Sequence, residues 1–137
     1  MTTRILIMGL PGSGKTRLAA NLTAYLFPSV SWFNADAIRE KYNDWDFSYE
    51  GRIRQGIRMR QMADESTADF VICDFVAPLP EMRTHFDAEC LIWMDTLDTG
   101  RYDDTNKIFV PPTIYDFRVT ELDATKWAKT ISEHLLK

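Results

Sequence analysis

The stretch Gly9-Leu10-Pro11-Gly12-Ser13-Gly14-Lys15-Thr16 decides the fold of this chain. It fits the pattern G-x-x-x-x-G-K-[ST] at every position, and this pattern is typical of a loop that binds phosphate groups. The apolar run at residues 4–8 predicts a buried strand before the loop. After the loop, apolar residues recur at helical spacing at Leu18, Ala19, Leu22 and Leu26. The loop therefore joins a strand to a helix, which is the context that the motif requires.

Each residue type in this loop has a physical reason. Gly12 and Gly14 can adopt backbone angles closed to other residues, so that backbone N–H groups converge on a polyphosphate. The helix that follows directs its N-terminal amides at the same place. Lys15 is expected to reach the β- and γ-phosphates of ATP, and the Thr16 hydroxyl to bind Mg²⁺. The predicted ATP-binding residues are Gly9, Pro11, Gly12, Ser13, Gly14, Lys15 and Thr16.

The composition indicates one soluble globular domain over residues 1–137. A chain of 137 residues can bury one core and has no room for a second. No apolar run approaches the ~20 residues of a membrane span, and the first residues enter a strand rather than a signal peptide. We therefore expect a cytoplasmic protein with no membrane partner. The net charge of −4 disfavours non-specific binding of nucleic acid, although a local basic patch could still exist.

Cys73 and Cys90 fall in two apolar runs that we expect to form adjacent core strands. Neither lies in a C-x-x-C motif or has a histidine partner at ligand spacing. We therefore expect two reduced, buried cysteines rather than a disulfide or a metal site.

A second strand is predicted over residues 30–33, and it ends at Asn34, just before Asp36 and Arg39. Because the carboxyl ends of parallel strands meet in one crevice, Asp36 and Arg39 are expected to arrive beside the phosphate-binding loop. There Asp36 can orient or deprotonate a substrate hydroxyl, and Arg39 can hold an anion. The alternative is a helix N-cap at Asn34 or Asp36, followed by a solvated charge.

Residues 42–48 mix aromatic rings with turn formers, which predicts a loop whose rings are candidates for stacking on a base. From residue 51 to about residue 63 the spacing becomes helical, and this helix carries Arg52, Arg54, Arg58 and Arg60. Arginine clusters are common on solvated helices, but beside such a loop in an acidic protein they suggest an anion site. We favour this role for Arg52 and leave the other three open.

Two further buried strands are predicted at residues 69–75 and 89–94. The first carries Asp74 near its end, where P-loop enzymes place an acid that contacts Mg²⁺ directly or through water. Residues 96–112 are polar without periodicity and predict a loop in the position of a lid. The tail predicts a last strand over 113–119 and a helix after Asp123. This alternation predicts a three-layer α/β P-loop fold, with a parallel sheet and helices on both faces.

With these positions in place, residues 5 to about 112 resemble the adenylylsulfate (APS) kinase family of small P-loop kinases. Residues 33–39, F-N-A-D-A-I-R, are similar to the family's L-D-G-D-N-[IV]-R, and residues 43–48, N-D-W-D-F-S, to its N-x-D-L-G-F-S. Arg52 with Gln55 falls on R-x-x-N, and residues 75–78, F-V-A-P, fall on F-I-S-P. The resemblance implies a kinase that transfers the ATP γ-phosphate to the ribose 3′-hydroxyl of APS.

The resemblance also implies roles for individual residues. The arginines and Gln55 hold the phosphosulfate end of APS, the aromatic and apolar residues enclose its adenine, and Lys107 lies near the phosphates. The substrate-binding residues are then Asp36, Arg39, Phe47, Arg52, Gln55, Phe75, Val76, Pro78, Lys107 and Phe109. We expect the catalytic residues to be Lys15, Asp36 and Arg101, with Lys107 as an alternative to Arg101. The candidate Mg²⁺ ligands are Thr16 with Asp36 or Asp74.

The chain departs from the family at four places. Ala77 stands where bacterial members have serine, which excludes a phosphoserine intermediate there. Asn34 replaces the first acid of D-G-D, whereas Asp74 adds an acid that the family usually lacks. The family's cationic lid, R-D-P-K-G-L-Y-K-K-A-R, is replaced by the shorter L-D-T-G-R-Y-D-D at residues 97–104. A short lid weakens water exclusion and the grip on ATP, so either Arg101 replaces the lost cations or the substrate differs.

Two other functions stay open. Polynucleotide 5′-hydroxyl kinases and nucleotide kinases also combine a P-loop with D-x-x-R, and a short lid leaves room for a longer strand. The net charge of −4 argues mildly against an extended nucleic acid. The other alternative is a nucleotide-binding regulatory protein without turnover, which the intact Lys15, Thr16, Asp36 and Arg39 oppose. The sequence does not determine the oligomeric state, and a homodimer is one candidate.

Overall fold

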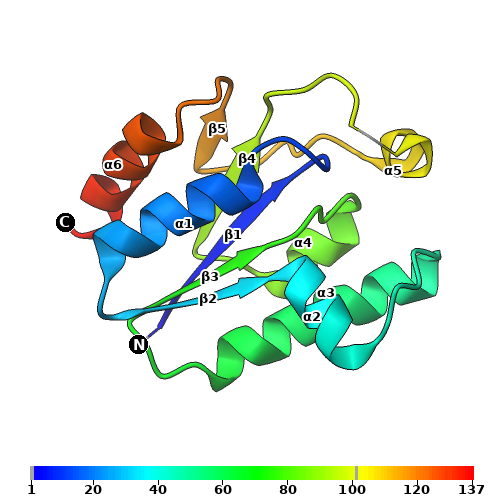
Figure 1. Cartoon of the computed structure of the whole chain (residues 1–137), viewed down its shortest axis with the longest axis horizontal. Coiled ribbons are helices and arrows are strands. Elements are labelled where there is room, and N and C mark those ends of the chain that lie inside the picture. Colours follow the sequence, from blue (N-terminus) through cyan, green and yellow to red (C-terminus); the bar gives the residue numbers. More distant parts are fainter. Residues whose placement is uncertain (1, 101) are drawn as a thin grey trace.

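The structure is a computed structural model that describes residues 2–100 and 102–137. Its strands form one parallel sheet in the order β2-β3-β1-β4-β5 (Figure 1). The strands are β1 (Thr3–Gly9), β2 (Val30–Asn34), β3 (Phe70–Asp74), β4 (Cys90–Met94) and β5 (Phe117–Val119). The helices are α1 (Lys15–Leu26), α2 (Ala35–Tyr42), α3 (Tyr49–Glu65), α4 (Pro80–Phe86), α5 (Asp103–Ile108) and α6 (Ala124–Leu135).

Helices cover both faces of the sheet (Figure 1). Successive residues of a strand point to opposite faces, so the central strand β1 feeds two cores. Ile5 and Ile7 pack in the core under α1 and α6, whereas Leu6 and Met8 pack in the core under α2, α3 and α4. A strand covered on both sides must be apolar throughout, which is why residues 5–8 read as an unbroken apolar run. The predicted three-layer α/β fold is confirmed.

The buried face of α1 confirms the helical spacing predicted after the loop. Leu18, Ala19, Leu22 and Leu26 are the buried residues of this helix. Three of the other predicted strands also form within a residue or two of their expected bounds. None of the described helices is both long and apolar enough to cross a membrane.

The prediction for the last strand was too long, because pairing with β4 begins only at Phe117. The Asp116 carboxylate accepts a hydrogen bond from the Leu91 amide at 2.7 Å, and the Asp116 amide donates to the Leu91 carbonyl at 2.9 Å. A side chain therefore takes the place of a backbone acceptor at this point of the ladder. The residues before it include Pro111 and Pro112, which have no N–H to donate.

The prediction that residues 96–112 lack regular structure was wrong in part, because α5 forms within them. This helix has six residues, too few to show an apolar repeat in the sequence. Asp103 and Asp104 lie in its first turn and Lys107 in its last turn, so the charges complement the helix dipole.

The expectation that the two cysteines lie on adjacent strands was wrong, because β1 separates β3 from β4. Cys73 faces the core under α3 and α4, whereas Cys90 faces the core under α1 and α6. Both are free and buried, and burial raises the pKa of each thiol to about 12. They are therefore small apolar core residues, as predicted.

Candidate active site

The carboxyl ends of β1, β2 and β3 open into a cleft of about 770 Å³, at the side of the molecule where α5 lies (Figure 1). Its phosphate-binding side is lined by Pro11, Gly12, Gly14, Lys15 and Thr16. Asp36, Asp74, Phe75 and Val76 line it from just beyond or at the ends of β2 and β3, and Phe47 and Arg52 line it from the start of α3 and the loop before it. The topology therefore gathers in one cleft residues that the sequence predicted from four separate segments.

The phosphate-binding loop has the backbone geometry that its glycines permit. Gly12 and Gly14 adopt φ angles of 86° and 100°, in the left-handed region that favours glycine. No side chain of the described residues caps α1, whose first residues line the cleft. The ammonium group of Lys15 donates hydrogen bonds to the carbonyls of Gly9 and Leu10, each at 3.0 Å. The loop thus holds a cation and open amides together, which suits a bound polyphosphate.

The remaining predicted residues of the loop lie beneath it. Ser13 is fully buried, and its hydroxyl has no hydrogen-bond partner among the described residues. A side chain at Gly9 would meet the Met94 carbonyl at 2.7 Å and the Ser13 hydroxyl at 2.8 Å. Close packing under the loop is therefore the reason for glycine at position 9.

Asn34 and Asp74 are paired across the parallel strands β2 and β3. The Asn34 amide nitrogen donates to the Asp74 carboxylate at 3.0 Å and to the Thr16 hydroxyl at 3.2 Å. The Asn34 oxygen accepts from the Ala37 amide at 3.1 Å and so caps α2. The N-cap alternative for Asn34 is confirmed, and the same side chain also links the strand ends to the start of α1.

The Asp74 carboxylate is the most buried acid of the cleft, with 2% of the residue exposed. Burial raises its pKa to about 6, against the opposing effect of hydrogen bonds from Trp32 and Asn34 and the charge of Lys15. Trp32 donates to this carboxylate at 2.6 Å. Nothing in the sequence pointed to Trp32, because a tryptophan in an apolar strand is usually a core residue.

The donor atoms at this end of the cleft fit Mg²⁺. The Thr16 hydroxyl and the Asp74 carboxylate are hard oxygen donors, and the Asn34 amide bonds to both. The described residues contain no group of three or more His, Cys, Asp or Glu side chains that could hold a metal alone. This is the arrangement expected where Mg²⁺ arrives with substrate phosphates and meets only one or two protein ligands.

At the other end of the cleft, two buried arginines approach the ring of Phe47. The Arg39 guanidinium lies 4.3 Å and the Arg52 guanidinium 5.5 Å from the ring centroid. Arg39 donates to the carbonyls of Asp44 and Asp46, at 3.0 and 3.2 Å, and Arg52 donates from Nε to the Phe47 carbonyl at 2.8 Å. In the described part of the chain neither arginine forms an ion pair.

Burial lowers the pKa of both guanidinium groups, partly opposed by Asp44 at Arg39 and by Asp104 at Arg52. Arg39 is 5% and Arg52 is 7% exposed. Two desolvated cations without a bonded carboxylate are costly unless an anion joins them. Of these two, Arg52 lines the cleft, whereas Arg39 lies against Phe47 and does not line it.

The other arginines of α3 hold neighbouring segments. Arg54 and Arg58 each bond the Asp44 carboxylate at 2.7 Å, and Arg54 also bonds Asp46 at 3.1 Å. The hydrogen bonds from Arg54 are the main reason that the pKa of Asp44 lies well below its usual range. Arg60 bonds Asp64 at 2.8 Å and the Phe86 carbonyl. The question left open by the sequence is thereby answered, because these three arginines already have partners.

Several predicted substrate residues do not line the cleft. The Gln55 amide donates to the Ala35 carbonyl at 2.9 Å, and its buried oxygen has no partner in the described residues. Phe109 lies under the guanidinium of Arg83, at 5.5 Å, and Pro78 accepts hydrogen bonds from Arg83 and Val110 through its carbonyl. Lys107 is exposed in the last turn of α5. Arg101 lies outside the described residues.

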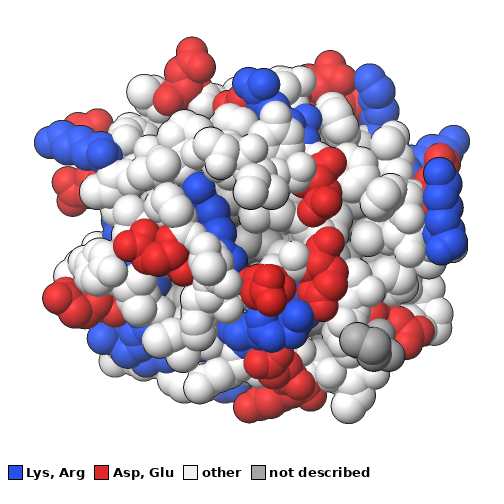
Figure 2. Space-filling view, turned by 180° about the vertical axis from the view of Figure 1, so that it is seen from behind, with Lys and Arg blue, Asp and Glu red and all other residues white. Residues whose placement is uncertain are grey.

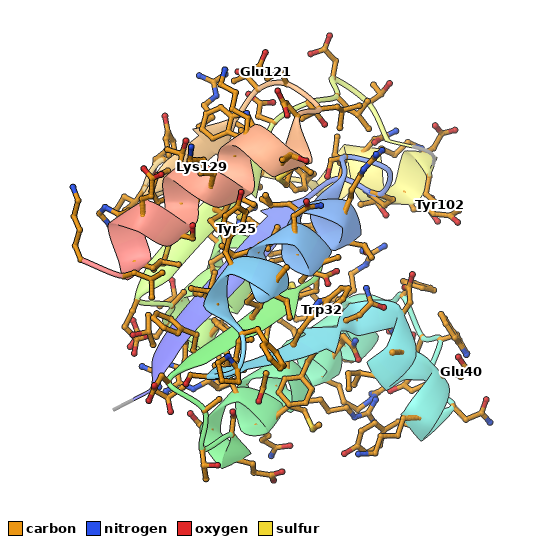
Figure 3. All side chains as sticks on the ribbon, turned by 60° about the vertical axis from the view of Figure 1, so that its left-hand side comes forward. Tyr25, Trp32, Glu40, Tyr102, Glu121 and Lys129 are labelled. Carbon is orange, nitrogen blue, oxygen red and sulfur yellow. The ribbon has the colours of Figure 1, made fainter. Side chains whose placement is uncertain are left out.

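Trp45, one of the rings of residues 42–48 that the sequence offered for stacking on a base, also lines the cleft. Four further cleft residues were not singled out from the sequence, and they are Arg17, Tyr102, Asp104 and Thr105. The last three belong to or adjoin α5, the helix that the sequence analysis missed. Tyr102 is labelled beside α5 in Figure 3.

A comparison with known families finds a match for the part of the chain that precedes α5. Residues 1–92 match the family model described as adenylylsulphate kinase. The chain belongs to this family. It is a P-loop kinase, and thus a nucleotide-binding phosphotransferase. The match contains the phosphate-binding loop and the ends of β2 and β3, and it stops before α5. No curated protein matches the sequence significantly.

Solved structures share the fold at low sequence identity. The Mycobacterium tuberculosis APS kinase CysC, solved with AMPPNP and APS, is 18% identical, with a TM-score of 0.81 over 99% of this chain and 98% of that chain. Shikimate kinase from Acinetobacter baumannii, solved with shikimate, is 15% identical, with a TM-score of 0.68 over 99% and 94%. A gluconokinase from Sinorhizobium meliloti 1021 is 12% identical, with a TM-score of 0.65 over 98% and 95%. These similarities establish the fold, which kinases with different acceptors share.

Proposed function

We propose that this kinase transfers the γ-phosphate of ATP to a hydroxyl of a nucleotide-like acceptor that carries an anionic group, with APS as the leading candidate. The observation that carries the proposal is the buried guanidinium of Arg52, which lines the cleft opposite the phosphate-binding loop and has no ion pair among the described residues. An anionic acceptor supplies the missing partner. Membership in the adenylylsulphate kinase family makes APS the first acceptor to test.

The acceptor site combines charge with apolar surface. Arg52 faces the cleft with one neighbouring cation, Arg39, behind the Phe47 ring. Phe75 and Val76 line the same cleft. A guanidinium group can donate two parallel hydrogen bonds to the oxygens of a phosphosulfate group, and a phenylalanine ring can stack on adenine. We therefore assign Arg52 to the phosphosulfate end of APS, and the Phe47 and Phe75 rings to its adenine.

The nucleotide site lies across the cleft. Lys15 and the backbone amides of Gly12 and Gly14 hold the phosphates of ATP in this proposal, with the start of α1 adding partial positive charge. Thr16 and Asp74 hold Mg²⁺ from the protein side. Bound Mg²⁺ supplies charge neutralisation at the β- and γ-phosphate oxygens.

The transfer step needs a group that serves the attacking hydroxyl. Asp36 lines the same cleft as the phosphate-binding loop and Arg52, from the first turn of α2, and it is exposed there. We propose that the Asp36 carboxylate accepts the proton of the acceptor hydroxyl. At the same time the hydroxyl oxygen bonds to the γ-phosphorus, and the bond between this phosphorus and ADP breaks. Arg101 or Lys107 is the proposed further cation near the transferred group.

The test is a coupled assay of ATP consumption with APS, a 5′-hydroxyl oligonucleotide, and a panel of nucleosides and nucleotides as separate acceptors. We expect APS to accelerate turnover and to yield ADP and 3′-phosphoadenylylsulfate in equal amounts. The Arg52→Lys variant keeps the charge but loses the planar fork, so its KM for APS should rise while its KM for ATP stays near the wild-type value. Turnover with another acceptor and none with APS would reject APS as the acceptor, and the protein would still be a kinase.

The assay also separates the two alternatives. Acceleration by the oligonucleotide alone would indicate a polynucleotide kinase. On the face of the molecule seen in Figure 2, acidic and basic side chains are interspersed rather than grouped by sign, and the net charge is −4, which disfavours an extended nucleic acid. Tight nucleotide binding with no turnover on any acceptor would indicate a regulatory nucleotide-binding protein.

A further inference from the structure

We propose that Trp32 is a positioning residue of the nucleotide site, which orients the Asp74 carboxylate toward the cation that accompanies ATP. The contact is a hydrogen bond of 2.6 Å from the indole Nε1 to Asp74 Oδ2. This inference rests on the proposed binding of Mg²⁺ with ATP. It concerns a residue that lies on the core side of the sheet and does not line the cleft.

The strand register explains how a core residue reaches the site. Trp32 and Asn34 are two positions apart on β2, so both side chains point to the same face of the sheet. Their partners on β3 are Ile72 and Asp74. Trp32 packs against the core under α1 and α6, and Figure 3 shows it on the side of β2 toward α1. Helix α1 packs on this face and begins at Lys15, in the phosphate-binding loop. This face of the sheet therefore extends from the core to that loop.

The two donors together hold both oxygens of the carboxylate. Trp32 donates to Oδ2, and Asn34 donates to Oδ1 at 3.0 Å and to Oδ2 at 3.4 Å. An ionised carboxylate can accept about four hydrogen bonds, so accepting capacity remains on a side chain that lines the cleft. An indole N–H is a donor only, so Trp32 fixes the carboxylate without competing for a cation. The result is an acid with one defined orientation and capacity left for a metal ion or its water.

A purely structural role for this contact explains less. Trp127 shows that an indole N–H can be buried in this protein without a partner among the described residues. The Trp32 N–H therefore did not require a carboxylate. Burying an acid at a strand end is also costly unless positive charge and hydrogen bonds compensate it, and only 2% of Asp74 is exposed. A cation from the ligand compensates that cost.

The test measures how much Mg²⁺ strengthens ADP binding, by calorimetry with Mg²⁺ and with EDTA. In Trp32→Phe, which keeps an aromatic ring and removes the N–H, we expect the Mg²⁺ enhancement to fall about tenfold. The affinity for ADP in EDTA should stay within about twofold of wild type, because the loop itself is intact. Trp127→Phe is the matched control, since its indole N–H has no partner among the described residues to lose.

Asp74→Asn provides a second route to the same measurement, with the indole left in place. It should lose the Mg²⁺ enhancement, and Trp32→Phe should cause no further loss in that background, because both changes remove one interaction. Wild-type Mg²⁺ enhancement in Trp32→Phe would overturn the proposal. So would an equal loss of ADP affinity in EDTA, which would mean a distorted loop. Neither measurement involves the acceptor, so the result is independent of whether APS is phosphorylated.

Discussion

The Arg52 guanidinium donates a hydrogen bond of 3.4 Å to the Thr105 hydroxyl, and this contact joins α3 to the short helix α5. Thr105 is 4% exposed, so the contact is shielded from water. The Asn106 side chain exchanges two hydrogen bonds with Gly100, at 2.7 and 3.1 Å, which ties α5 to the segment before it. Helix α5, within the segment that the sequence predicts to be a lid, is therefore attached to the arginine proposed to bind the acceptor.

We expect Thr105→Val to raise the KM for the acceptor about fivefold, because it removes the hydroxyl and keeps the volume. The KM for ATP and kcat should change little, since the hydroxyl that is removed bonds to Arg52 on α3. Thr105→Ser restores the hydroxyl and should restore the acceptor KM. Initial rates at varied acceptor and varied ATP test this prediction. An equal rise of both KM values in Thr105→Val would show that α5 serves the nucleotide instead.

The sequence predicted the phosphate-binding side of the cleft because its information is local. The loop, its strand and its helix occupy consecutive residues, and Gly12 and Gly14 adopt left-handed backbone angles that glycine itself permits. The central strand was equally clear, since burial on both faces makes a continuous apolar run. The membership in the adenylylsulphate kinase family likewise follows from the first two thirds of the chain.

The acceptor side depends on contacts that a linear sequence does not display. Arg52, Arg54 and Arg58 lie on one helix and differ only in what packs around them, so the sequence could not assign Arg54 and Arg58 to Asp44. The contact of Trp32 with Asp74 requires the register of β2 and β3. Thr105 lies on a helix too short to have a periodic pattern.

Gly51 keeps the loop of residues 42–48 close to α3. A Cβ at this position would lie 2.1 Å from the Asp46 carbonyl oxygen, which forces the loop to move. We expect Gly51→Ala to lower the free energy of unfolding by about 1–3 kcal/mol and to raise the acceptor KM, because Phe47 moves with the loop. Denaturant unfolding and initial rates measure the two effects.

Gly56 is the matched control within the same helix. A Cβ there would meet only the Met82 methyl carbon, at 3.6 Å, which is an ordinary contact. Gly56→Ala should therefore raise the free energy of unfolding by about 0.5–1 kcal/mol, as expected for removing a glycine from a helix interior. Similar effects of the two substitutions would contradict the close approach at Gly51.

Asp74 should give the protein a distinct dependence of stability on pH. Its pKa is raised from 3.8 to about 6 by burial, so between these values the folded state holds a proton that the unfolded state has lost. The contribution of Asp74 to the free energy of unfolding therefore falls as pH rises from about 4 to about 6, by on the order of 3 kcal/mol. Above pH 6 this contribution is constant.

The measurement is the difference in free energy of unfolding between wild type and Asp74→Asn, without nucleotide or Mg²⁺, from pH 4 to pH 8. From pH 4 to pH 6 the free energy of unfolding of wild type should fall relative to that of Asp74→Asn, and above pH 6 the difference should stay constant. Asp69→Asn removes one carboxylate from an exposed residue and serves as the control. A flat difference for Asp74→Asn over the whole range would show that its carboxyl is not desolvated in solution.

Asp36→Asn tests the residue assigned to the attacking hydroxyl. The substitution keeps the size of the side chain and removes its capacity to take a proton, so kcat should fall by about 10²-fold or more. The affinity for ATP should be nearly unchanged, because Asp36 lies on α2 and not in the phosphate-binding loop.

Glu40→Gln is the control, since Glu40 is an exposed acid of the same helix that does not line the cleft. Initial rates with saturating ATP and calorimetric ATP binding separate the outcomes. Near-normal turnover in Asp36→Asn would remove Asp36 from this role and direct the search for a base to the other acids of the cleft, Asp74 and Asp104.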